Sequence, residues 1–271
     1  MNYLGETFIM DNRPIGLLDS GVGGLTVVKK IVAKMPHEAT VFIGDNAHIP
    51  YGDKSKAEII ALTKQSVNFL LSKNVKLIIF ACNTATAVAM KAIQKEIEPQ
   101  IIGVVQSGAV AAVNATKNKN VAVVATKMTV GLHAYQAEIQ ARDPQITVNE
   151  LATPQIVPLI EANAGHQAYV SALKKILLPI NDLNIDTLVL GCTHYPIIRN
   201  EFAQCLKPDI QIIDPADQVA NYTYNVMKNN QMFTSSSAKG KHEYYTTGDV
   251  KMFDELGKTV LQDENFNGHH L

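Results

Sequence analysis

Short apolar runs rich in β-branched residues recur along the chain and alternate with longer segments of helical character. The apolar runs predict strands at residues 15–18, 39–43, 75–81, 101–105, 121–125, 146–151, 187–190, 210–213 and 243–246. The predicted helices span residues 24–34, 56–73, 85–97, 107–116, 130–142, 166–178, 196–202, 216–228 and 251–261. Continuous apolar strands separated by helices are typical of a parallel sheet covered on both faces. The pattern therefore predicts a doubly wound α/β fold.

Polar residues at strand ends indicate that this α/β arrangement of strands and helices occurs twice along the chain. Asp19 ends one predicted strand and Cys82 follows a later one, and Thr126 and Cys192 are spaced in nearly the same way. We therefore expect two similar α/β lobes with mainly parallel sheets, one formed by residues 10–98 plus 208–265 and the other by residues 99–207. Such sheets bind ligands beyond the carboxyl ends of their strands, so the site is predicted to lie between the lobes.

Two of the three cysteines stand at predicted strand ends. Cys82 lies in the segment FACNT and Cys192 in the segment LGCTH, and a helix is expected soon after each. Unsatisfied N–H groups and the helix dipole favour a nearby anion, which predicts thiol pKa values below the free value of about 8.5. Two matched thiols indicate a reaction that needs two such groups. Cys205 lies in a helical segment without a polar escort and is expected to be structural.

Composition narrows the class of protein. The chain has 271 residues, 46% of them hydrophobic, which suffices for one large domain or two smaller ones. Its net charge is −1 and no window collects basic residues, which argues against nucleic acid or an anionic membrane surface as a partner. Three cysteines do not form a disulfide framework. Neither Cys82 nor Cys192 has another thiol within four residues, so no metal site is expected.

The first thirteen residues carry no export signal, and no apolar stretch approaches the roughly 18 residues that span a bilayer. We therefore expect a cytoplasmic protein. Met10 directly precedes the first predicted strand, so residues 1–9 are interpreted either as a disordered extension or as a result of the choice of start site.

Two loops that follow predicted strands are candidates for the walls of a polar pocket. The segment DSGVGG at residues 19–24 places glycines where a strand turns into a helix, so its N–H groups can hold an anion. It lacks the pattern of a nucleotide-binding loop, and a tight turn is the alternative interpretation. The segment DNAHIPYG at residues 45–52 brings Asp, His and Tyr to a strand end, unless it is an ordinary loop.

Taken together, these segments resemble a known family. GLLDSGVGGLTV, GDNAHIPYG, ACNTATA, VATKMTVG and LGCTHYP, in this order and at these intervals, are similar to segments of glutamate racemase. That family consists of cofactor-independent bacterial enzymes that interconvert L- and D-glutamate for peptidoglycan synthesis. The resemblance extends over residues 14–261. It implies glutamate as the substrate, no cofactor, and a homodimer.

The resemblance also implies how the two thiols act. Racemisation removes a proton from one face of an α-carbon and delivers another to the opposite face, which two groups can do by exchanging acid and base roles. By similarity to the family, Cys82 acts on the D-enantiomer with Asp19 as its helper. Cys192 acts on the L-enantiomer with His194 as its helper.

Further residues match the family near its site. Asp45 and Glu161 correspond to additional carboxylates, which the resemblance places among the catalytic residues. The residues implied in substrate binding are Asp19, Ser20, Tyr51, Gly52, Asn83, Thr84, Thr126, Thr193 and His194. They offer hydroxyl, amide and backbone donors rather than an arginine, and fixed N–H dipoles at helix starts can hold the two carboxylates of glutamate.

The chain departs from the family pattern at three places. His48 stands where Arg is common, Ala125 where Gly is common, and Gln106-Ser107 where Pro often occurs. None of these removes a proton-transfer group. Aspartate racemase is the alternative within the superfamily, although Glu rather than His typically follows its second Cys-Thr. A two-lobed binding protein without chemistry and a thiol-dependent hydrolase, which needs only one nucleophile, are alternatives from other classes.

Overall fold

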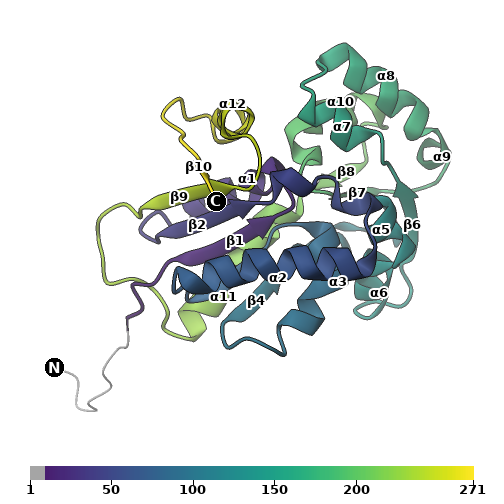
Figure 1. The fold of residues 1–271 in the computed structure, drawn as a ribbon. Helices are drawn as coiled ribbons and strands as arrows, with labels where there is room; N and C mark the ends of the chain where they lie inside the picture. Colours follow the sequence, from purple (N-terminus) through teal and green to yellow (C-terminus); the bar gives the residue numbers. More distant parts are fainter. Residues whose placement is uncertain (1–9) are drawn as a thin grey trace.

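The computed structural model describes residues 10–271, and the expectation for residues 1–9 lies outside this range. Two sheets form two lobes, and every paired strand in them is parallel (Figure 1). The first sheet has the order β10 (His269–His270), β9 (His242–Thr246), β2 (Thr40–Gly44), β1 (Ile15–Asp19), β3 (Leu77–Phe80) and β4 (Gln100–Gly103). The second has the order β6 (Thr147–Ala152), β5 (Asn120–Ala125), β7 (Thr187–Gly191) and β8 (Gln211–Ile213). The predicted α/β fold with two parallel sheets is confirmed.

Helices follow most of the strands and cover both sheets. In the first lobe and at its junction they are α1 (Leu25–Lys34), α2 (Lys56–Ser72), α3 (Asn83–Ile93), α4 (Val104–Ala115), α11 (Pro215–Asn229) and α12 (Val250–Leu261). Around the second sheet they are α5 (Lys127–Gly131), α6 (Ala134–Gln140), α7 (Ile156–Glu161), α8 (His166–Ile176), α9 (Leu178–Asn181) and α10 (Arg199–Cys205). Short 3-10 turns lie at Val22–Gly24, Asn46–His48, Tyr51–Asp53 and Tyr195–Ile198.

The two sheets share one strand order. Strands β2-β1-β3-β4 and β6-β5-β7-β8 are the same pattern, so β1 corresponds to β5 and β3 to β7. In each sheet the order in which strands are added reverses between two central strands, β1 and β3 in the first sheet and β5 and β7 in the second. Ligands bind beyond the carboxyl ends of the strands at such a point. Asp19 therefore marks the switch point of the first sheet, and Thr126 marks that of the second.

Both expected lobe boundaries change. Strand β4 pairs with β3, so the first sheet extends to Gly103, whereas residues from 99 onward were expected in the second lobe. Strand β8 pairs with β7, so the second sheet extends to Ile213, whereas residues from 208 onward were expected in the first lobe. The chain returns to the first lobe through α11, whose apolar face packs with α1 in the first lobe's core. The return is later than expected because a short strand at a sheet edge gives no signal of which sheet it joins.

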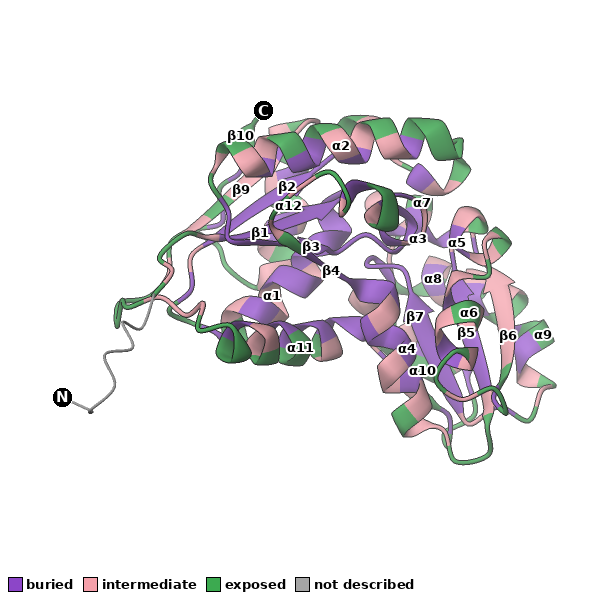
Figure 2. Ribbon diagram, turned by 90° about the horizontal axis from the view of Figure 1, so that it is seen from below, coloured by how far each residue is buried: buried purple, intermediate pink, exposed green. Residues whose placement is uncertain are grey.

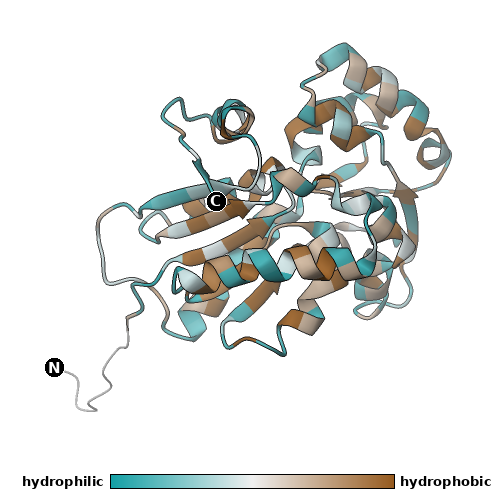
Figure 3. Ribbon diagram, viewed as in Figure 1, coloured by the Kyte–Doolittle hydropathy of each residue, from teal (hydrophilic) through white to brown (hydrophobic). Residues whose placement is uncertain are grey.

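Burial explains why the central strands read as continuous apolar runs. Strands β1, β2, β3 and β7 are buried at every residue, whereas the edge strand β6 is only partly buried (Figure 2). Strands with a helix on each face expose neither face to water, so apolar side chains are favoured on both. Figure 3 shows the same contrast in hydropathy between the central strands and the mixed surfaces of α2 and α11.

Several elements differ from their predicted bounds. The strand expected over residues 101–105 ends at Gly103, and two buried valines begin α4, because packing context overrides the β preference of valine. The helix expected over residues 130–142 is divided into α5 and α6, because His133 adopts a left-handed conformation with φ of 51°. Residues 269–270, where no strand was predicted, form β10 beside β9.

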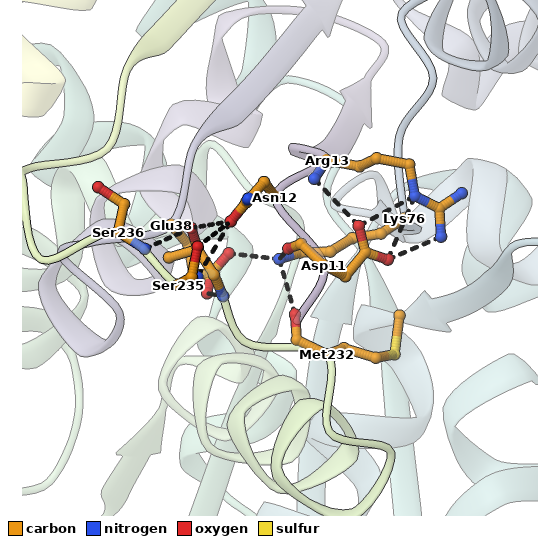
Figure 4. Close-up of polar contacts among 9 residues, drawn as sticks. Asp11, Asn12, Arg13, Glu38, Lys76, Met232, Ser235 and Ser236 are labelled. Atoms are coloured by element: carbon orange, nitrogen blue, oxygen red, sulfur yellow. Dashed lines mark hydrogen bonds and ion pairs between the residues drawn. The ribbon is translucent and has the colours of Figure 1, made fainter. Parts of the chain in front are cut away.

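A buried ion pair lies where the segments that precede β1, β2 and β3 meet the segment that follows α11. Lys76 donates to the carboxylate of Glu38 and, at 2.8 Å each, to the carbonyl oxygens of Asp11 and Met232 (Figure 4). Both charged side chains are buried. Removing one partner of such a pair leaves an uncompensated charge and typically costs 3–5 kcal/mol, so this contact holds three distant segments in place.

Across residues 10–271, no helix is long and apolar enough to cross a membrane.

Candidate active site

Both strand-end thiols line one cavity between the lobes. Cys82 comes directly after Ala81 at the end of β3, and Cys192 comes directly after β7. The cavity measures about 20 Å³. Its lining consists of Ser20, Ile49, Pro50, Tyr51, Gly52, Cys82, Asn83, Thr84, Thr126, Val157, Cys192, Thr193 and His194. The switch points of the two sheets therefore face a single cavity.

The thiol of Cys82 lies in a buried and acidic environment. Cys82 caps α3, where its sulfur accepts from the N–H of Ala85 at 3.4 Å and donates to Oγ of Ser20 at 3.5 Å. Burial, and then the nearby carboxyl of Asp19, raise the pKa of Cys82 to about 12. The prediction of a lowered pKa is therefore wrong for this thiol, because desolvation of the thiolate outweighs the helix N-terminus.

The carboxyl of Asp19 is held between the lobes. Its oxygens accept from the N–H of Gly21 at 2.9 Å and from Oγ1 of Thr193 at 3.0 Å, and Thr193 belongs to the second lobe. Burial raises the pKa of Asp19 to about 6, against the lowering effects of His194 and of these hydrogen bonds. A carboxyl that titrates in this range can both accept and release a proton near neutral pH.

The thiol of Cys192 has a histidine beside it. Nδ1 of His194 lies 3.8 Å from the sulfur of Cys192, and Nε2 of His194 hydrogen-bonds to the carboxylate of Glu161 on α7. Burial acts against the imidazolium, but the contacts with Cys192 and Glu161 raise the pKa of His194 well above its usual value. The His194 ring packs directly against Gly23, because a Cβ at that position would lie 2.6 Å from Nδ1 of His194.

The local structure after Cys192 differs from the prediction. A 3-10 turn at Tyr195–Ile198 comes first, and α10 begins only at Arg199. Cys192 is therefore not at the start of an α-helix, and the polar group that its sulfur contacts is the His194 ring. The pair has the geometry of a charged relay in which Glu161 orients the imidazole.

Asp45 lies outside the cavity and hydrogen-bonds to Tyr51, which lines it. Its carboxylate accepts from the hydroxyl of Tyr51 at 2.7 Å and from Oγ1 of Thr247 at 2.6 Å, and it contacts Nδ1 of His48 at 2.7 Å. Tyr51 lines the cavity, whereas Asp45 does not. The structure thus places Asp45 as a support for Tyr51, and the His48 departure lies in the same network.

Hydroxyl groups join the lobes around the cavity. Oγ1 of Thr84 in the first lobe lies 2.9 Å from Oγ1 of Thr126 in the second. Gly52 meets Thr126 closely, since a Cβ on Gly52 would lie 2.8 Å from Cβ of Thr126. Every residue implied in substrate binding lines the cavity except Asp19, which lies directly beside it through Ser20 and Thr193.

Sequence reasoning missed the apolar part of the lining. Ile49 and Pro50 belong to the loop before Tyr51, and Val157 belongs to α7, a helix that was not predicted. Ile49 and Pro50 lie inside the DNAHIPYG segment already singled out, but nothing near Val157 marked it as part of a site. These three residues are the apolar part of the lining, and hydroxyl and amide groups supply its polar part.

The chemistry of the lining does not resemble a metal centre. Among residues 10–271, no group of three or more His, Cys, Asp and Glu is placed to hold a metal ion. Of the other departures from the family pattern, Ala125 ends β5 and Gln106-Ser107 lies in α4, and neither lines the cavity.

The family described as Asp/Glu/hydantoin racemase matches residues 15–223. A glutamate racemase from Lactobacillus helveticus is 59% identical over 97% of this chain and 98% of its own. The glutamate racemase from Francisella tularensis, solved in complex with D-glutamate, has a TM-score of 0.89 at 35% identity and covers 97% of this chain and 98% of its own. A glutamate racemase isoform from Bacillus anthracis has a TM-score of 0.91 at 32% identity and covers 96% of this chain and 97% of its own.

An aspartate racemase from Picrophilus torridus is more distant, with 18% identity and a TM-score of 0.60 over 80% of this chain and 93% of its own, and shares the fold alone. The full-length identity to glutamate racemases, together with the cavity that both thiols line, agrees with the resemblance in the strand-end segments. The chain belongs to the Asp/Glu/hydantoin racemase family and, within it, to the glutamate racemases.

Proposed function

We propose that this chain interconverts L- and D-glutamate by proton transfer between the substrate's α-carbon and two thiols, Cys82 and Cys192. The observation that carries the proposal is that one small cavity is lined by both thiols, each of which follows the equivalent strand of a different lobe. A carbon held between two such groups can lose a proton on one face and gain one on the other. No third proton-transfer group is needed at the carbon itself.

The environments of the thiols support a direction for each. Cys82 has a raised pKa and is therefore a thiol ready to donate, which suits delivery of a proton to form D-glutamate. Cys192 has the His194–Glu161 pair beside it, which can accept or return a proton when Cys192 acts on L-glutamate. Environments that separate two titrating groups in this way are typical of acid–base pairs.

The substrate is proposed to be held by hydroxyl and amide groups. Ser20, Asn83, Thr84, Thr126 and Thr193 line the cavity and offer hydrogen-bond donors to its two carboxylates. Donors fixed before the reaction begins stabilise negative charge that develops on the substrate as the α-proton leaves. Asp19, beside Cys82, and His194, beside Cys192, are proposed to relay protons to and from the two sulfurs.

We further propose that the two lobes, residues 10–103 plus 214–271 and residues 104–213, form the two halves of the site. The enzyme is proposed to work without a cofactor in the cytoplasm, as a homodimer, and to supply D-glutamate for peptidoglycan. Support for these details comes from the resemblance of the motif set, and for the lobe division from membership of the strands in two sheets.

Incubation of the protein with L-glutamate in deuterated water tests the proposal. We expect D-glutamate to accumulate to equal amounts of both enantiomers, with deuterium from solvent at the α-carbon and without added pyridoxal phosphate or metal. Chiral chromatography with mass spectrometry measures both quantities. Unchanged L-glutamate with protium at the α-carbon would contradict the proposal.

A further inference from the structure

Tyr135 occupies a slot in the second lobe that two glycines make possible. The residue lies on α6 and its side chain is fully buried. A Cβ at Gly108 would lie 2.9 Å from the Tyr135 ring, and one at Gly191 would lie 3.1 Å from its other edge. Both contacts are closer than ordinary packing allows, so larger residues at either position would displace the ring. The ring is therefore held in one orientation from two sides.

This orientation sends the Tyr135 hydroxyl across to the first lobe. It donates to Oδ1 of Asn83 at 2.7 Å, and both residues are buried. Burial, and then the nearby Asp214 carboxylate, raise the pKa of Tyr135 far above its usual value, so the hydroxyl remains protonated and able to donate. Tyr135 does not line the catalytic cavity, whereas Asn83, the residue after Cys82, does.

The bond determines what Asn83 presents to the cavity. A carboxamide has one accepting oxygen and one donating nitrogen, and exchanging the two reverses its character. With Oδ1 engaged by Tyr135, the Nδ2 group is left to donate on the cavity side. An acidic substrate with two carboxylates needs donors there, and an oxygen turned toward it would repel it.

We propose that Tyr135 is a positioning residue for substrate binding, acting through the carboxamide of Asn83 from the opposite lobe. This inference rests on the proposed function, because it assigns a carboxylate of glutamate to Nδ2 of Asn83. Since the hydroxyl and the amide belong to different lobes, the bond forms only when the lobes are together. The donor is thereby oriented in the closed state, in which the substrate is held.

Replacement of Tyr135 by phenylalanine tests the proposal, because the change keeps the ring and removes only the hydroxyl. We expect Tyr135→Phe to raise KM for both enantiomers about tenfold, which corresponds to about 1.4 kcal/mol, and to leave kcat within about twofold. Because the two enantiomers have equal free energy, kcat/KM must fall by the same factor in both directions. Steady-state assays in the two directions measure this, and their agreement serves as an internal check.

Two further variants separate positioning from simple support of the fold. Tyr195→Phe is the matched control, because Tyr195 is equally buried and its hydroxyl bonds to Thr153 within the second lobe. We expect a loss of thermal stability in both variants and a rise in KM only in Tyr135→Phe. In an Asn83→Ala background, the Tyr135→Phe change is expected to have no further effect on KM.

An unchanged KM in Tyr135→Phe, or the same rise in KM in Tyr195→Phe, would overturn the proposal. So would additive effects of Tyr135→Phe and Asn83→Ala. The wild-type assay keeps these results apart from the proposed function. If the wild-type protein racemises glutamate, the function stands whatever the variants do; if it does not, the proposed function itself has failed.

Discussion

The two thiols of this site have the same side chain in unlike surroundings. Cys82 is enclosed with the Asp19 carboxyl, and its pKa is raised to about 12. Cys192 instead contacts an imidazole whose pKa is raised and which is itself oriented by Glu161. One side of the cavity therefore favours the protonated sulfur, and the other side supplies a cationic partner. A reaction that must pass a proton in either direction uses such a difference.

Asp19 gives this difference a measurable pH dependence. Its folded-state pKa of about 6 lies above the usual value of 3.8, so the folded state holds the proton more tightly than the unfolded state. Ionisation above about pH 6 therefore costs stability, by ~3 kcal/mol at about 1.4 kcal/mol per pKa unit, and the cost disappears below about pH 4. We expect Asp19→Asn to be more stable than wild type at about pH 8 and equal to it at about pH 4, as measured by urea unfolding. A stability difference that does not change with pH would contradict this assignment.

At the scale of elements, the site depends on where strands end and helices begin. The apolar runs around β1, β3, β5 and β7 are long enough to be recognised in the sequence, and the polar residues that follow them are those that line the cavity. Those strands were predicted because burial on both faces leaves an unbroken apolar pattern. Asp19, Cys82, Thr126 and Cys192 could therefore be placed at neighbouring strand ends from the sequence.

Other elements carry no such signal. The break at His133 depends on one left-handed residue that pairs with Glu150, and β10 depends on a distant partner strand. The contact of Asp19 with Thr193 and that of Tyr135 with Asn83 join residues from different lobes. Sequence periodicity reports which face of an element is buried, but it does not report which element covers it. The raised pKa of Cys82 was missed for the same reason.

The contact between the Tyr51–Asp53 turn and α5 yields a prediction at this scale. A Cβ on Gly52 would lie 2.8 Å from Cβ of Thr126, so Gly52→Ala is expected to keep the lobes from closing fully and to lower kcat/KM by about tenfold or more. Gly131→Ala is the matched control. Gly52 and Gly131 both line a second, outer cavity, and a Cβ on Gly131 meets no atom within 4 Å. That control is expected to retain wild-type kinetics. Equal kcat/KM in the two variants would show that this contact does not control closure.

At the scale of the whole molecule, the structure is a closed arrangement of two lobes. Hydrogen bonds between Thr193 and Asp19, Thr84 and Thr126, and Tyr135 and Asn83 join them around the cavity. A cavity of about 20 Å³ is close to the space that one water molecule requires, and glutamate is many times larger. We therefore expect the two lobes to move relative to one another when glutamate enters the cavity.

The central claim is that one carbon lies between two thiols that come from different lobes. The most direct test follows α-deuterium incorporation and racemisation in deuterated water for Cys82→Ala and Cys192→Ala, with each enantiomer as the starting substrate. We expect neither variant to racemise glutamate. Cys82→Ala, which keeps Cys192, is expected to introduce deuterium only into L-glutamate, and Cys192→Ala only into D-glutamate. Racemisation at the wild-type rate by either variant, or deuterium in the same enantiomer for both, would contradict the account.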